Sequence, residues 1–204
     1  CKQIRENITY KKGEFLIMST EAVDRRVRRT RKQLRECLVT LLKQKKVQDI
    51  TVRELTELAG ISRGTFYFHY ADIYALMDQM EAAQLARLND LMDTLIPSIS
   101  QEDAPPALVA LFTYMTENPD LCQALYGKSW ESEFTRNAKK LIAERCLGEF
   151  APDGGTEEQK YMLAFAVNGC FGTIVAWQEA GFRPPAAEIA RITWQAIRAV
   201  KGRM

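Results

Sequence analysis

Apolar residues recur at intervals of three and four along most of the chain, which is the spacing of amphipathic helices. Leu34 and Leu38 belong to the first helix that this spacing predicts. A long helix is expected over residues 73–95, and two helices with apolar residues on more than one side are expected over 156–181 and 184–200. The sequence therefore predicts an all-α fold of about nine helices.

Residues 51–70 predict two short helices joined by a tight turn. Thr51 and Glu54 have the spacing of a capping box, in which the hydroxyl accepts a hydrogen bond from the third residue and the carboxylate reaches back to the cap. Gly60 ends the first helix and Ser62 caps the second. The inward face of the first helix is predicted to carry Val52, Leu55, Leu58 and Ala59. The outward face is predicted to carry Arg53, Glu54, Thr56 and Glu57.

The second short helix leaves unusual side chains uncovered if Ile61, Phe66 and Tyr70 pack inward. Its exposed or half-exposed residues are then Arg63, Gly64, Thr65, Tyr67, Phe68 and His69. A glycine near a helix start costs about 1 kcal/mol against alanine, which makes sense if the backbone must approach something closely. Arginine can donate two hydrogen bonds to guanine, and tyrosine or histidine can donate to phosphate. This helix is therefore predicted to read nucleic acid.

The run GISRGTFYFHY, which follows TVREL, resembles the DNA-binding domain of the TetR family of bacterial transcriptional regulators. In that family the second helix of the motif enters the major groove. The resemblance implies that Arg53, Arg63, Gly64, Thr65, Tyr67 and His69 meet DNA, that the caps Thr51 and Ser62 touch phosphate, and that Phe68 is an aromatic shared with many members. One departure is that the lysine usual at the start of the following helix is replaced here by Ile73.

The same resemblance implies a domain organisation. Residues 1–20 form an N-terminal extension that we expect to be poorly ordered, residues 21–75 form a three-helix helix-turn-helix domain, and residues 76–204 form a domain that binds a ligand and dimerises. Charge agrees with this division, because residues 21–72 hold 12 Lys or Arg against 7 Asp or Glu, whereas residues 73–204 hold 12 against 17. A basic head on an acidic body suits a DNA-binding protein.

The first helix begins with a run of arginines that includes Arg28. Such a run is a solvated face in most proteins, but cations at a helix N-terminus oppose the helix dipole, and an anionic partner removes that conflict. We therefore expect Arg28 to contact phosphate.

Composition excludes several classes of protein. With 204 residues, 47% of them apolar and a net charge of +2, the chain is ordinary for a globular protein. Its five cysteines are widely spaced and its only histidine is His69, so no metal site or disulfide framework is expected. The sequence holds no catalytic motif, cofactor fingerprint, signal peptide or apolar run that could span a membrane, and we expect a cytoplasmic protein that is not an enzyme.

A site for a small effector is implied by the resemblance, and large apolar side chains suggest where it lies. The expected pocket residues are Met77, Met80, Met92, Phe112, Met115, Tyr126, Trp130, Phe134 and Asn168. Helical spacing also fits a plain core for these residues. Because no buried charge stands out among them, the effector is expected to be apolar and uncharged.

The last two helices carry more apolar surface than one core needs, which predicts a homodimer interface. The residues expected in it are Asn168, Phe171, Gly172, Val175, Trp194 and Ile197. The function expected is a homodimeric repressor that binds a pseudo-palindromic double-stranded DNA operator until a small effector releases it. The alternative is a coactivator or adaptor that keeps the fold but acts mainly through protein partners.

Overall fold

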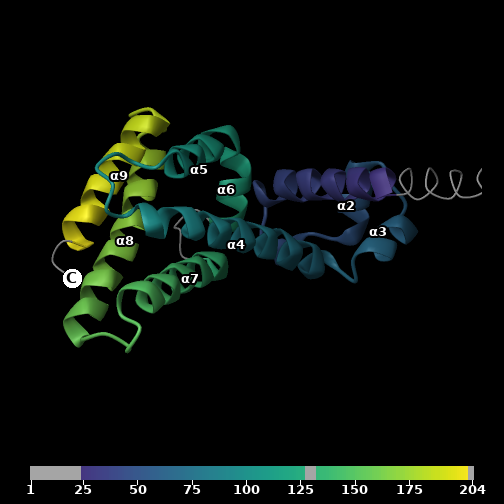
Figure 1. Ribbon diagram of the computed structural model, residues 1–204. Helices are drawn as coiled ribbons and strands as arrows, with labels where there is room; N and C mark the ends of the chain where they lie inside the picture. The colour runs from purple at the N-terminus through teal and green to yellow at the C-terminus, as the bar shows by residue number, and fades with distance from the viewer. Residues whose placement is uncertain (1–23, 127–131, 202–204) are drawn as a thin grey trace, which may run out of the picture. The chain divides into compact units, whose positions relative to one another are not determined.

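The computed structural model describes residues 24–126 and 132–201, and every regular element in these ranges is helical (Figure 1). The expected all-α class is confirmed. The N-terminal helix covers residues 24–42. The elements that follow are η1 (Val47–Asp49), α2 (Val52–Ala59), α3 (Arg63–His69), α4 (Ile73–Ser98), α5 (Pro106–Glu117), α6 (Pro119–Tyr126), α7 (Glu133–Phe150), α8 (Glu157–Glu179) and α9 (Ala186–Lys201). The expected extension over residues 1–20 lies outside the described residues.

The chain divides into two compact units between Leu76 and Met77. In the first unit the N-terminal helix, α2 and α3 share one apolar core. Its members are Leu34, Leu38, Leu41, Ile50, Leu55, Ala59, Phe66 and Tyr70. Phe66 is fully buried there, as the spacing of α3 predicts.

The structure corrects the predicted faces of α2. Thr51 does cap the helix by accepting from the N–H of Glu54 at 3.2 Å, but the Glu54 carboxylate pairs with Lys45 and does not complete a capping box. Thr56 is buried, and its hydroxyl donates to the carbonyl of Val52 at 2.8 Å. Leu58 is instead 50% exposed. A short helix can thus bury a threonine when its hydroxyl is satisfied within the helix.

The end of α4 differs from the one that we expected, and a side chain closes the end of α5. The helix α4 continues to Ser98, with Pro97 inside its last turn. The side-chain amide of Asn118 donates back to the carbonyl of Tyr114 at 2.9 Å and so closes the C-terminus of α5.

The second unit is a helical bundle in which α9 packs against α5 and α8, and α7 packs against α8. A capping box between Thr156 and Gln159 begins α8. The indoles of Trp177 and Trp194 are buried in the core, and their N–H groups donate to the carbonyls of Pro184 at 2.6 Å and Gln101 at 3.2 Å. Both large aromatics are therefore buried without leaving a polar atom unsatisfied.

Candidate nucleic-acid interface and ligand cavity

The turn between α2 and α3 is held by backbone hydrogen bonds and by the hydroxyl of Ser62. Gly60 has a φ of 62°, a left-handed conformation that glycine adopts without strain. The N–H of Ile61 then donates to the carbonyl of Thr56 at 3.1 Å. Ser62 caps α3 by accepting from the N–H of Thr65 at 3.0 Å. These contacts fix the direction in which α3 leaves the turn.

The two short helices are anchored to the N-terminal helix and to the segment that follows it. The Gln33 side chain donates to the carbonyl of Ala59 at 2.6 Å, at the end of α2. The ion pair between Lys45 and Glu54 joins the segment after the N-terminal helix to the start of α2. Phe66 fills the core beneath α3. As a result α2 is held at both of its ends, and α3 is held by the face that carries Phe66.

The other face of α3 is uncovered within its unit. Arg63 and Gly64 are exposed, and Tyr67 and Phe68 are 57% and 79% exposed. Two further residues predicted to meet DNA, Thr65 and His69, are half-buried. Large aromatics so open to water are costly unless a partner covers them.

Gly64 has no role in the packing of its own unit. A Cβ added there would meet only the Ser62 hydroxyl oxygen, at 3.7 Å, which is ordinary contact, and the backbone is not left-handed. Alanine would therefore fit, and it would favour the helix. The absence of a side chain at this position leaves room for a molecule outside the chain to approach the backbone.

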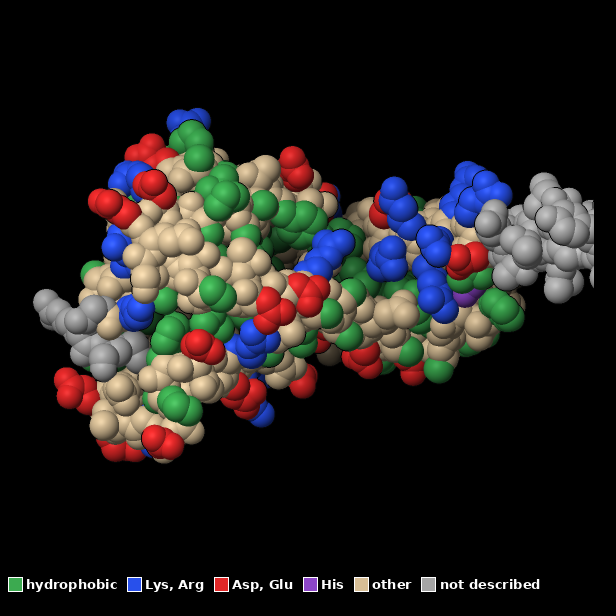
Figure 2. Space-filling view, in the orientation of Figure 1, with side chains coloured by type: hydrophobic (Ala, Val, Ile, Leu, Met, Phe, Trp, Pro, Cys, Tyr) green, Lys and Arg blue, Asp and Glu red, His purple; other side chains and the backbone are tan. Residues whose placement is uncertain are grey.

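Lys and Arg side chains gather on the first unit in the view of Figure 2. Arg28 and Arg53, both predicted to meet DNA, are exposed and pair with Asp24 at 2.5 Å and Glu57 at 2.7 Å on their own helices. Within the described part of the chain, Arg63 makes no ion pair, so its guanidinium is available to a ligand. Exposed pairs of this kind contribute little to stability, about 0.3–0.5 kcal/mol each, and a phosphate can displace them.

Arg31 was not singled out from the sequence, yet it lies beside the C-terminal end of α3. Its Nε is buried without a hydrogen-bond partner. Burial, together with the charge of Arg31, lowers the pKa of His69 from its ordinary value and so favours the neutral imidazole. The spacing of Arg28, Arg31 and Arg35, which places them along one face of the N-terminal helix, is the sequence signal that would have pointed to Arg31.

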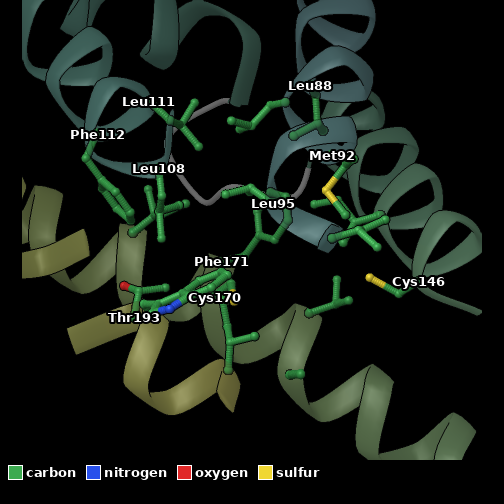
Figure 3. Close-up of a pocket in the computed structure, with 18 of the residues that line it drawn as sticks. Leu88, Met92, Leu95, Leu108, Leu111, Phe112, Cys146, Cys170, Phe171 and Thr193 are labelled. Carbon is green, nitrogen blue, oxygen red and sulfur yellow. The ribbon is translucent and has the colours of Figure 1, made fainter. Parts of the chain in front are cut away.

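A cavity of about 430 Å³ lies inside the second unit (Figure 3). Its wall is apolar and comes from α4 through α9, with Leu88, Leu95, Leu108 and Phe171 among the side chains that face it. The volume falls within the range of about 300–1,000 Å³ that small-molecule sites occupy.

Four of the predicted pocket residues line this cavity, namely Met92, Phe112, Met115 and Tyr126. Others are placed elsewhere. Met80 and Phe134 are buried but belong to other parts of the core, and Met77 is half-buried away from the wall. Asn168 is exposed, where its carbonyl accepts from Lys139 at 3.0 Å. Trp130 lies outside the described residues.

Residues predicted for a dimer interface also separate into two groups. Phe171, Trp194 and Ile197 line the cavity, and the first two are buried. Val175 is half-buried against the core. Asn168 and Gly172 are exposed on α8. The apolar side chains that do face outward were not predicted for this role, and they are Tyr161, Phe165 and Ile192.

Three cysteines line the cavity. They are Cys122, Cys146 and Cys170, and burial raises the pKa of each to about 11. The thiols are therefore protonated at neutral pH and act as weakly polar wall atoms.

In the part of the chain that is described, no helix combines the length and apolar character needed to cross a membrane. Among the same residues, no three His, Cys, Asp or Glu side chains are grouped as ligands of a metal ion.

Comparison with known proteins supports a regulatory role. The TetR family model described as "Transcriptional regulator C-terminal region" matches residues 102–199. An uncharacterized HTH-type transcriptional regulator, YxbF of Bacillus subtilis (strain 168), is 38% identical over 48 residues. That match spans 24% of this chain but only 13% of the relative.

A solved structure shows the same fold, and a second one is similar in part. A tetR-family transcriptional regulator from Streptomyces coelicolor aligns with a TM-score of 0.51 at 18% identity, over 86% of this chain and 81% of its own. A TetR transcriptional regulator from Rhodococcus sp. RHA1 aligns with a TM-score of 0.46 at 18% identity, over 83% and 96%. The region matched by the family model, the helical fold and the two-helix motif agree, and each is that of a TetR-family transcriptional regulator.

Proposed function

We propose that this regulator is a homodimeric repressor that binds a pseudo-palindromic operator and is released from it by a small apolar molecule. Each subunit places α3 in the major groove, where Arg63 reads guanine and Tyr67 and Phe68 contact the groove wall. Arg28, Arg53, His69 and the capping residues Thr51 and Ser62 contact the phosphate backbone. The protein carries out no catalysis in this role.

The observation that supports the proposal most strongly is the contrast between the two faces of α3. One face is fixed by Phe66, while the other exposes Tyr67, Phe68 and an arginine that makes no ion pair within the described residues. Gly64, which the chain's own packing does not need, lies on the same open side. A helix that is rigidly held yet uncovered suits insertion into a groove.

The dimer is supported by the outward face of α8 and α9. Tyr161 and Phe165 are 75% and 72% exposed, and Ile192 of the adjacent α9 is 40% exposed. Further along α8, Gly172 would leave an added Cβ in open space. Two aromatics followed by a small residue on one helix face allow the same surface of a second copy to pack closely. A twofold protein is also what a palindromic site requires.

Effector control is supported by α4, which is separated from α3 by three residues and supplies Leu88, Met92 and Leu95 to the cavity wall. A ligand that favours one position of α4 changes how α3 is presented. A coupling of about 1–3 kcal/mol would change operator affinity by about 5- to 150-fold, and the operator would weaken the ligand by the same factor.

Selection from a random pool of DNA duplexes tests this function. We expect the protein to enrich a sequence with twofold symmetry, and a promoter that carries it should be silenced by the protein in a reporter assay. Failure to enrich any sequence would favour the adaptor alternative, in which protein partners replace DNA.

A further inference from the structure

The hydroxyl of Thr193 is a buried polar atom without a partner in the wall of the cavity. Thr193 is 4% exposed and lies in the middle of α9. Its Oγ1 makes no hydrogen bond in the structure, although the residue lines the cavity (Figure 3). A buried hydroxyl left unsatisfied destabilises a protein, so each such atom calls for an explanation.

Helical threonines in this chain usually satisfy themselves. Thr56, Thr113 and Thr173 each donate to the carbonyl four residues earlier, at 2.8, 3.0 and 2.9 Å. The same bond is open in principle to Thr193, yet it is not made. Valine has the same shape and would fill this position without the cost of a buried hydroxyl. The hydroxyl of Thr193 therefore makes no stabilising hydrogen bond within the chain.

The wall carries other polar groups, but among the described residues Thr193 is the only one of its members with a buried side-chain oxygen or nitrogen that lacks a partner. The other polar members include the phenols of Tyr114 and Tyr126, the amide of Gln84, three thiols and two cations. The thiols of Cys122, Cys146 and Cys170 are protonated and are weak hydrogen-bond formers. Two cations touch the cavity, but both are engaged with aromatic rings: Arg87 lies 5.3 Å from the ring centre of Tyr114, and Lys201 lies 5.7 Å from that of Phe150.

We propose that the cavity binds a neutral, mostly apolar molecule that carries one hydroxyl or carbonyl group, and that this group pairs with the Thr193 hydroxyl. A threonine hydroxyl can donate or accept, so either group satisfies it. The inference rests on the proposed effector role of the cavity and adds the chemistry of the ligand. Thr193 is then the residue that distinguishes a hydroxyl or carbonyl compound from a hydrocarbon of the same shape.

Three matched probes test the proposal: pentylbenzene, phenylbutanol and phenylbutanoate, each measured by displacement of Nile red from the full-length protein. The variants are Thr193→Val, which removes the hydroxyl at constant shape, and Thr193→Ser, which keeps it. Comparing one ligand across variants cancels the cost of removing that ligand from water. We expect Thr193→Val to bind phenylbutanol about 3- to 10-fold more weakly and pentylbenzene unchanged, with Thr193→Ser close to wild type for phenylbutanol.

A thermal melt of the ligand-free variants gives a second reading. Thr193→Val should melt at the same temperature as the wild type or higher, because it removes an unpaired buried hydroxyl. A clearly lower melting temperature would mean that the hydroxyl already has a partner in the protein, which would overturn the argument.

Other outcomes also overturn the inference. These are equal weakening of phenylbutanol and pentylbenzene by Thr193→Val, no weakening of either, or failure of all three probes to displace Nile red. Tightest binding of phenylbutanoate, lost in Arg87→Ala, would assign an anionic ligand instead. Operator binding is measured in parallel. Its absence alongside the expected probe pattern would count against the repressor proposal and leave the role of Thr193 supported.

Discussion

Gly64 is expected to be needed for DNA binding and not for the stability of the protein. Alanine fits at this position, since an added Cβ has only one neighbour, at 3.7 Å. We expect Gly64→Ala to raise the free energy of unfolding by up to about 1 kcal/mol and to weaken operator binding, because the methyl group keeps the backbone from the DNA. Urea unfolding and fluorescence anisotropy with a labelled operator measure the two effects.

Gly60 supplies the matched control. Its φ of 62° strains any side chain, so Gly60→Ala should lower stability by about 1–2 kcal/mol. A Gly64→Ala variant that binds the operator as well as the wild type would show that nothing approaches this backbone closely.

Arg63 and Arg28 are expected to differ in what they recognise. Arg63→Ala should weaken operator binding by about 1–3 kcal/mol and leave binding to random DNA nearly unchanged, because a guanidinium at the start of α3 meets base edges. Arg28→Ala should weaken binding to all duplexes and reduce the slope of affinity against salt by about 1, because it meets phosphate. Titrations at several salt concentrations measure both. Equal losses on operator and random DNA for Arg63→Ala would remove its base-reading role.

The cavity thiols predict a dependence on pH. Burial raises the pKa of Cys122, Cys146 and Cys170 to about 11 from 9.0. Only the thiolate reacts with iodoacetamide, so at pH 8 native labelling should be about 100-fold slower than in urea and should rise about tenfold per pH unit. The unfolded state loses these protons first, so the thiols favour folding below pH 9, and this contribution declines as the pH rises toward 11.

Mass spectrometry of tryptic peptides distinguishes the cavity thiols from Cys37 of the first unit, which is half-buried and serves as the internal reference. Labelling of a cavity thiol at the rate of the urea-unfolded chain at pH 8 would contradict its burial in the native protein.

At the scale of single elements, local patterns were predicted more reliably than long-range partners. The caps by Thr51 and Ser62 and the break at Gly60 depend on neighbouring residues, and all are observed. The carboxylate of Glu54 was predicted from local spacing, but it pairs with Lys45, a contact set by how the N-terminal helix packs. Thr193 was missed because nothing local shows that its hydroxyl is buried.

The exposed face of α8 leads to a prediction about the oligomeric state. Gly172→Phe places a large ring where the second copy is expected, and open space around Gly172 means that the subunit itself accommodates the side chain. We expect this variant to be a folded monomer in sedimentation velocity. Gly148→Phe on α7, where an added Cβ is equally unhindered, should remain a dimer. A Gly172→Phe protein that sediments as a dimer would refute this interface.

For the whole molecule, the sequence predicted the helical class and the basic character of the DNA-binding head, while the positions of cavity and interface residues needed the structure. Phe171 and Trp194 were expected to face a second subunit, but they face the cavity. In a helix that is apolar on several sides, hydrophobicity does not reveal which side meets the subunit's own core and which meets a partner. Packing against α5 and α7 decides it.

The central claim is that two copies of α3 read one operator through the major groove. Methylation protection of guanine N7, which lies in the major groove, tests it most directly on the selected duplex. We predict two protected patches about 34 Å apart, which is one turn of DNA. In the Arg63→Ala variant, the guanines that Arg63 contacts should become open to methylation again. Binding that protects no guanine N7, or that protects a single patch, would contradict the claim.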